Sequence, residues 1–244
     1  MIEIKNLTKS FGKNLVWKDV SIDIHPGETL AIIGKSGSGK SVLMKHLNVL
    51  LYPDEGEVLI DGENVFEMRY ARLRKLRQRF GVLFQGAALF DSITAFENVS
   101  FPLRYFSDFT EQEIRNRVLE SLDLVNLSDI GNKSPAELSG GMRKRVGLAR
   151  AIVLKPDYLL YDEPTSGLDP QTSNEINDLI INMAETLDIT SVVITHDMHS
   201  VLRVADKVAF LDEQKLSWYG TIDEMKTSDH KALKAFVKAS EYTI

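Results

Sequence analysis

Short apolar runs alternate with longer amphipathic stretches along most of the 244-residue chain. Each run has the length of a strand, and the stretches between the runs carry apolar residues at the spacing of an amphipathic helix. The runs cover residues 29–33, 82–84, 158–161, 192–195 and 208–211. Strands that alternate with helices are typical of a parallel sheet covered by helices. This pattern predicts an α/β fold.

The first part of the chain has a different pattern, in which apolar and polar residues alternate. Residues 2–7 and 20–24 show this alternation, and residues 57–60 form another short strand-like run before Asp61 and Gly62. A period of two places successive side chains on opposite faces of a strand, as in a half-buried sheet. We therefore expect an antiparallel β lobe at the N-terminal end of the α/β core.

Helical periodicity dominates residues 95–151, which contain few strand signals. This segment is predicted to be a helical subdomain inserted into the α/β core, which comprises residues 1–94 and 152–220. Residues 221–244 are expected to form a C-terminal helical extension, with an apolar face that packs on the body of the protein or on a partner chain. Together these parts make a single domain over residues 1–244.

Composition and charge limit the functions that such a fold could carry. The sequence is 43% hydrophobic and 26% charged, which fits one compact unit with a buried core. A net charge of −6 disfavours nucleic-acid binding, which requires a basic surface. The absence of cysteine excludes disulfides, thiolate zinc sites and cysteine nucleophiles.

Neither a secretory signal nor a membrane span is evident in the sequence. Residues 1–5 lack the basic region and apolar stretch of a signal peptide. No apolar run reaches the roughly 18 residues that a spanning helix needs. We therefore expect the protein to remain unexported and to act at a membrane only through a partner.

The strongest chemical signal is a glycine-rich segment at residues 34–41, between the predicted strand 29–33 and a predicted helix at 42–50. Such a turn lets several backbone N–H groups converge on a phosphate at a helix N-terminus, whereas a flexible loop is the alternative. Lys40 is expected to reach the outer phosphates, and Ser41 to offer its hydroxyl to Mg2+. The predicted nucleotide-binding residues here are Gly34, Ser36, Gly37, Ser38, Gly39, Lys40 and Ser41.

A second signal lies far along the chain, where the predicted strand 158–161 is followed by Asp162 and Glu163. Most adjacent acidic residues are solvated surface, but charge at the end of an apolar strand is disfavoured without a task. Beside a phosphate loop, Asp162 could hold Mg2+. Glu163 would then orient and deprotonate the attacking water.

A second glycine-rich helix start, residues 138–142, reads Leu-Ser-Gly-Gly-Met and precedes a predicted helix at 143–153. With the two signals above and with Gln85, residues 166–169 and His196, it resembles the ordered motif series of ABC ATPases over essentially the whole chain. The resemblance implies a P-loop NTPase fold of the RecA-like type and an enzyme that hydrolyses ATP to ADP and phosphate. It further implies a head-to-tail homodimer.

The resemblance also assigns roles to individual residues. In such dimers, ATP on residues 34–41 of one chain is covered by Ser139, Gly140 and Gly141 of the other. Gln85 is expected near Mg2+ and the attacking water, and His196 at the terminal phosphate. The remaining expected contacts are Asp169 at the dimer interface and Phe11 stacked on adenine, where core packing is the alternative for Phe11.

Further similarity points to one group within this family. Residues 85–90, 98–104 and 138–150, with Met142 where many ABC ATPases carry glutamine, resemble the MlaF-like ATPases of the Mla/Mce group. This implies phospholipid transport between inner and outer membranes from the cytoplasmic face of the inner membrane. The implied partners are an MlaE-like permease, an Mce-domain lipid-binding protein and a small STAS-domain subunit.

Other readings of the same sequence stay open. The chain could serve another ABC system, such as solute import or lipoprotein release, or act as a soluble ABC protein without a transport role. The apolar residues 87–90 are expected to face a membrane partner, with packing inside the subdomain as the alternative. The basic residues 143–145 are expected to lie in solvent, with a contribution to a nucleotide site as the alternative. Histidines other than His196 lack metal-ligand spacing and are expected on the surface or in packing.

Overall fold

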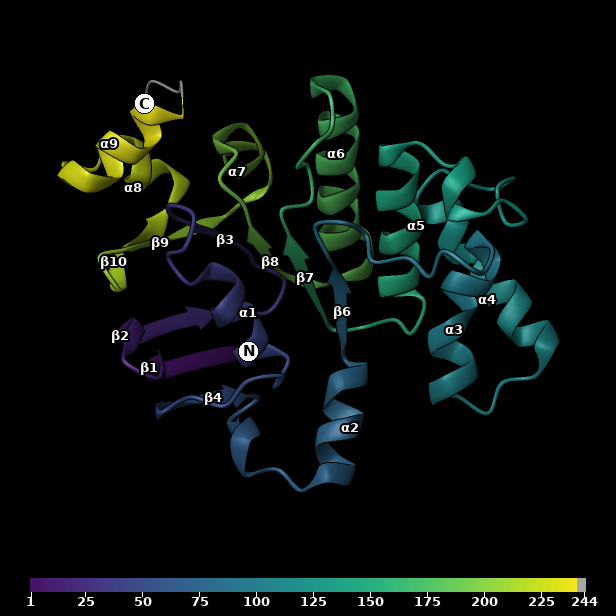
Figure 1. Ribbon diagram of the computed structural model, residues 1–244, viewed down its shortest axis with the longest axis horizontal. Coiled ribbons are helices and arrows are strands. Elements are labelled where there is room, and N and C mark those ends of the chain that lie inside the picture. The colour runs from purple at the N-terminus through teal and green to yellow at the C-terminus, as the bar shows by residue number, and fades with distance from the viewer. Residues whose placement is uncertain (241–244) are drawn as a thin grey trace.

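The computed structural model describes residues 1–240 and contains two sheets with helices around them (Figure 1). The smaller sheet is antiparallel at each strand pair, in the order β2-β1-β4-β5. Its strands are β1 (Ile2–Phe11), β2 (Asn14–Ile24), β4 (Glu55–Ile60) and β5 (Glu63–Asn64). The antiparallel N-terminal lobe is thus confirmed, although its first two strands are longer than the alternation predicted.

The larger sheet has six strands in the order β10-β9-β3-β8-β7-β6. All neighbours pair in parallel except β10, which pairs antiparallel with β9 at one edge. The strands are β3 (Thr29–Ile33), β6 (Phe80–Leu83), β7 (Tyr158–Asp162), β8 (Thr190–Ile194), β9 (Lys207–Asp212) and β10 (Lys215–Thr221). Strands β3 and β8 are buried at every position, as expected for parallel strands covered on both faces.

Helices pack on the larger sheet, and further helices lie beyond its two edges (Figure 1). They are α1 (Lys40–Leu47), α2 (Tyr70–Gln78), α3 (Ala95–Phe106), α4 (Glu111–Leu124), α5 (Gly140–Ile152), α6 (Pro170–Leu187), α7 (Met198–Val204), α8 (Ile222–Thr227) and α9 (Lys231–Ala239), with 3-10 turns at Val65–Glu67 and Pro135–Glu137. The C-terminal extension expected over residues 221–244 therefore contains α8 and α9, and its last four positions, 241–244, lie outside the described residues.

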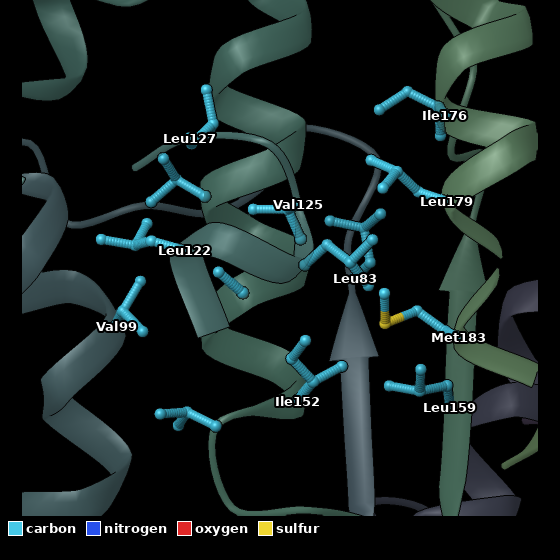
Figure 2. Packing of buried hydrophobic residues seen from close by; sticks show 14 of the residues in the cluster. Leu83, Val99, Leu122, Val125, Leu127, Ile152, Leu159, Ile176, Leu179 and Met183 are labelled. Atoms are coloured by element: carbon cyan, nitrogen blue, oxygen red, sulfur yellow. The ribbon is translucent and has the colours of Figure 1, made fainter. Parts of the chain in front are cut away.

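Local sequence signals explain where the helices of the predicted subdomain begin. Thr94 and Glu97 form a capping box at the start of α3, and Thr110 and Glu113 form another at the start of α4. Figure 2 shows the apolar cluster between these helices, α5, α6 and the neighbouring strands. Because this cluster is continuous with β6 and β7, α5 lies directly against the edge of the sheet.

The carboxyl ends of the parallel strands determine where a ligand can bind. Strand β3 leads into the glycine-rich segment, β6 leads towards Gln85, β7 ends at Asp162 and β8 leads to His196. Carboxyl ends of parallel strands lie at one edge of a sheet, where open α/β folds bind ligands. The predicted chemical groups of four distant segments are therefore brought to one edge.

His46 of α1 lies in the core between the two sheets and is fully buried. Its Nδ1 lies 2.7 Å from the carbonyl oxygen of Val42, and its ring centroid lies 5.3 Å from that of Trp17. Burial lowers the pKa of His46, against a smaller opposing effect of the Val42 carbonyl. The expectation of a packing role for this histidine is confirmed.

We expect His46 to make the folded state sensitive to acid. The unfolded chain binds a proton at His46 near the ordinary pKa of 6.5, whereas the folded chain holds the ring neutral. Stability from this residue is therefore present above pH 6.5 and is lost as the pH falls below that value. Between about pH 7 and pH 5, the Tm of the wild type should fall more steeply than that of His46→Leu. His25→Gln, on the exposed surface, should leave the wild-type slope unchanged.

Candidate functional site

A pocket of about 1230 Å³ lies at the carboxyl ends of β3, β7 and β8. Most of the predicted site residues line it. They are Phe11, Gly34, Ser36, Gly37, Gly39, Lys40, Ser41, Gln85, Asp162, Glu163 and His196. The structure thus gathers residues from five separate segments of the sequence around one cavity.

The phosphate loop between β3 and α1 has a shape that requires glycine at particular positions. A Cβ atom on Gly34 would contact the carbonyl oxygen of Leu211. Gly39 has a φ of 90°, and a Cβ atom there would lie 2.5 Å from Nε1 of Trp17. Larger residues at either position would therefore push the loop away from the sheet. Ser38 does not line the pocket, in contrast to its neighbours in the loop.

Lys40 begins α1 and is only 8% exposed. Its Nζ donates to the carbonyl oxygens of Gly34 at 2.8 Å and Lys35 at 3.1 Å, across the loop. Burial lowers the pKa of Lys40, while the nearby carboxylates of Glu163 and Asp162 oppose that effect. The helix N-terminus has no side-chain cap and no acidic residue in its first turn, so its free N–H groups remain available to an anion.

Ser41 and Asp162 lie side by side in the lining of the pocket. The Ser41 hydroxyl donates to Oδ1 of Asp162 at 3.4 Å. Burial and the adjacent charge of Glu163 raise the pKa of Asp162. Residues 1–240 contain no cluster of three His, Cys, Asp or Glu side chains suited to a metal ion. The Ser41 hydroxyl and the Asp162 carboxylate nevertheless fit Mg2+, which accepts a hydroxyl, a carboxylate and phosphate oxygens as ligands.

Glu163 is held in an uncommon conformation directly after β7. Its φ is 48°, and its N–H donates to the carbonyl oxygen of Ile194 at 2.8 Å. The carboxylate lies between two groups from the end of β8: Oε1 is 2.9 Å from Nδ1 of His196, and Oε2 accepts from Oγ1 of Thr195 at 3.3 Å. Backbone strain of this kind in a non-glycine residue occurs often at functional sites.

Gln85 and Phe11 line the outer parts of the pocket. Nε2 of Gln85 donates to Oγ of Ser166 at 3.3 Å, which connects the segment after β6 with the segment after β7. The Phe11 ring is 49% exposed, and Nζ of Lys9 lies 5.4 Å from its centroid. Phe11 is thus a surface residue at the pocket rather than part of the core.

Ser139, Gly140, Gly141 and Asp169 do not line the pocket of their own chain. Oγ of Ser139 accepts from the Met142 N–H at 3.2 Å and caps α5. The carboxylate of Asp169 accepts from the N–H and hydroxyl of Thr172 at 2.9 and 2.6 Å, and caps α6. These residues therefore lie outside the pocket at the starts of α5 and α6, where Ser139 and Asp169 are exposed and Gly141 is buried.

Two features of this region were not predicted from the sequence. Residues of α9, including Phe236, line the pocket, and Leu233 and Val237 of the same helix are buried in the core. Lys144 is 5% exposed, so the expectation that it lies in solvent is wrong. Its position within an otherwise apolar side of α5 was the available signal for burial.

Within the part of the chain from residue 1 to 240, none of the helices has both the length and the apolar character of a transmembrane span.

Known proteins with similar sequences share a family and differ in their cargo. A probable ribonucleotide transport ATP-binding protein of Mycobacterium leprae is 44% identical over 97% of this chain and 68% of its own length. The intermembrane phospholipid transport ATP-binding protein MlaF of Haemophilus influenzae is 39% identical over 98% of this chain and 90% of its own length. A methionine import ATP-binding protein of Clostridioides difficile is 40% identical over 97% of this chain and 74% of its own length.

Solved structures and the family profile agree with the fold. The dimeric post-hydrolysis structure of the ATP-binding cassette MJ0796 with ADP and phosphate has a TM-score of 0.83 and 33% identity, and covers 91% of this chain and 99% of that one. The expected P-loop NTPase fold is thereby confirmed. The sequence profile of the ABC transporter family matches residues 17–166, more than half of the chain. The chain therefore belongs to the ABC transporter family as an ATP-binding subunit that hydrolyses ATP to ADP and phosphate.

Proposed function

We propose that two copies of this chain bind ATP with Mg2+ between them and drive a separate membrane permease. The observation that carries this proposal is that the predicted site residues of one chain do not all lie together. Lys40, Asp162 and Glu163 line the pocket, whereas Ser139 lies on a different surface of the same chain. A second copy placed head to tail would bring its own Ser139 to the phosphates.

The residues of the pocket suit hydrolysis of a terminal phosphate. Lys40 and the free N–H groups of α1 would bind the phosphate oxygens and stabilise the charge of the transition state. Mg2+, when bound through Ser41, Asp162 and Gln85, would neutralise phosphate charge. Glu163 would accept a proton from the attacking water, since its carboxylate is fixed by Thr195 and His196.

In a dimer, binding and hydrolysis of ATP would move the two chains relative to each other. Each triphosphate would place negative charge between two surfaces that both bind it, namely the phosphate loop of one chain and the N-terminus of α5 of the other. Hydrolysis would remove that shared charge, and the surfaces would separate. The dimeric structure of MJ0796 with ADP and phosphate supports this arrangement by similarity.

A surface next to Gln85 supports the proposed permease contact. Within residues 87–90, Ala87 is buried and Leu89 packs against the core, but Ala88 and Phe90 are exposed. Phe90 lies 4.9 Å from Phe101 between ring centroids, and Phe101 is also exposed. Adjacent exposed aromatic rings of this kind often mark a protein interface.

We further propose that the cargo is phospholipid, moved between inner and outer membranes, with the chain at the cytoplasmic face of the inner membrane. Similarity to the Haemophilus influenzae MlaF protein over 90% of that protein's length supports this choice, together with Met142 and the segments around it. Ribonucleotide transport and methionine import compete with it, because relatives with those names are about as similar.

Co-purification with partners tests the choice of cargo. We expect the tagged chain, isolated from membranes of its source organism in mild detergent, to retain an MlaE-like permease and an Mce-domain protein, with or without a STAS-domain subunit. A Lys40→Ala variant should retain the same partners if its fold and surface are intact, and so serves as the control for ATP-dependent contacts. Recovery of a solute-binding protein with an unrelated permease would contradict lipid transport and favour import.

A further inference from the structure

Helix α5 carries a buried lysine that contacts the backbone of the proposed catalytic residue. Nζ of Lys144 donates to the carbonyl oxygen of Glu163 at 3.0 Å, and Lys144 is 5% exposed. No carboxylate among residues 1–240 lies within 4.0 Å of this ammonium group as an ion-pair partner. Burial lowers the pKa of Lys144, and the charges of Glu163 and Asp162 partly offset that effect. A buried cation without a direct ion pair is costly, which indicates that its hydrogen bond has a task.

The backbone that Lys144 contacts is the strained part of the site. Glu163 has a φ of 48°, a backbone conformation that residues other than glycine adopt with difficulty. Its carbonyl oxygen accepts from Lys144 and from the N–H of Ser166 at 3.2 Å. Because the backbone orientation of a residue determines where its side chain points, these two donors help to set the direction of the Glu163 carboxylate.

The same helix contacts the segment that follows Gln85. Arg150 donates from its guanidinium to the carbonyl oxygens of Ala87 at 2.7 Å and Ala88 at 2.8 Å. Both alanines also have positive φ angles, of 60° and 47°. One helix therefore donates through Lys144 to the turn after β7 and through Arg150 to the turn after β6. Any movement of α5 relative to the sheet would displace both turns together.

We propose that Lys144 is a positioning residue, which orients Glu163 towards the attacking water and makes that orientation depend on the position of α5. The inference rests on the proposed role of Glu163 in hydrolysis. It explains how contact of a partner with the surface near Phe90 would alter catalysis. That contact would move α5 through Arg150, and Lys144 would transmit the displacement to Glu163.

Kinetics of Lys144 variants test the proposal. Lys144→Met removes the donor but keeps an unbranched side chain only one atom shorter, and we expect kcat for ATP to fall by about 10²-fold through misplacement of Glu163. The KM for ATP should change by less than about threefold, since the phosphate loop is untouched. Lys144→Arg, which keeps a donor, should recover at least about one tenth of wild-type kcat. Lys155→Met, an exposed lysine after α5, should match the wild type.

A double variant separates a positioning role from a structural one. In the Glu163→Gln background, single-turnover rates should fall no more than about twofold further when Lys144→Met is added, because both changes act on the same step. If Lys144→Met does not fold, Lys144→Leu, which is also apolar and cannot donate a hydrogen bond, replaces it with the same expected loss.

Three outcomes would overturn the proposal. They are a wild-type kcat in the Lys144 variants, an equal loss of ATP affinity and kcat, and an additive loss in the double variant. These results are distinct from failure of the proposed function. If Glu163→Gln alone hydrolysed ATP at the wild-type rate, the role of Glu163 itself would be wrong, whereas an inactive Glu163→Gln beside an active Lys144→Met would remove only Lys144.

Discussion

Glu163→Gln is expected to lower the rate of ATP hydrolysis by about 10³-fold while ATP still binds. The amide keeps the size and most contacts of the carboxylate but cannot accept a proton from water at neutral pH. The phosphate loop is unchanged, so the affinity of the variant for ATP should equal or exceed that of the wild type. With hydrolysis blocked, the ATP-bound dimer should accumulate.

Two measurements check this expectation. Phosphate release reports turnover, and size-exclusion chromatography with ATP and Mg2+ reports the dimer. Glu185→Gln changes an exposed glutamate on α6 and should behave as the wild type in both assays. Normal phosphate release by Glu163→Gln would show that another group activates the water.

Ser139→Arg is expected to abolish hydrolysis in a dimer of two altered chains, although the pocket of each chain is intact. The arginine side chain would occupy the space that the partner's phosphates need at the N-terminus of α5. Ser128→Arg, at an exposed position of the same predicted subdomain, is the matched control and should retain activity. Loss of activity therefore tests whether Ser139 belongs to the site.

Mixing two inactive variants tests which chain supplies Ser139. Lys40→Ala chains lack the lysine that binds the phosphates, and Ser139→Arg chains lack the serine that would contact the phosphates bound by the partner chain. In a mixed dimer with head-to-tail sites, one site combines Lys40 of the Ser139→Arg chain with Ser139 of the Lys40→Ala chain and is intact. An equal mixture should recover hydrolysis in up to about a quarter of all sites. Absence of any recovery would contradict a site shared between chains.

Local sequence signals predicted the parts of the candidate site that lie within one segment, and the structure places those parts around one pocket. The phosphate loop combines glycines, Lys40 and Ser41 between a strand and a helix, and the folded loop indeed needs glycine at positions 34 and 39. Asp162 and Glu163 follow a buried strand and reach the same pocket because β3 and β7 are both parallel neighbours of β8.

Features that depend on tertiary packing were not predicted from the sequence. Lys144 lies between two arginines in the sequence, which resembles a solvated basic run, yet contact with the turn after β7 buries it. The part of the pocket lining that α9 supplies depends on how this helix packs on β9, where the ring centroids of Phe236 and Phe210 lie 5.2 Å apart. Strand β10 pairs antiparallel with β9 because the connection between them is short. The predicted alternation of strands and helices did not include this hairpin.

A structure of the Glu163→Gln variant with ATP and Mg2+ tests the shared site most directly. We predict a head-to-tail dimer in which Oγ of Ser139 from one protomer lies within hydrogen-bond distance of the terminal phosphate bound by Lys40 of its partner. Phosphates bound by Lys40 but remote from Ser139 of every neighbouring molecule would contradict it.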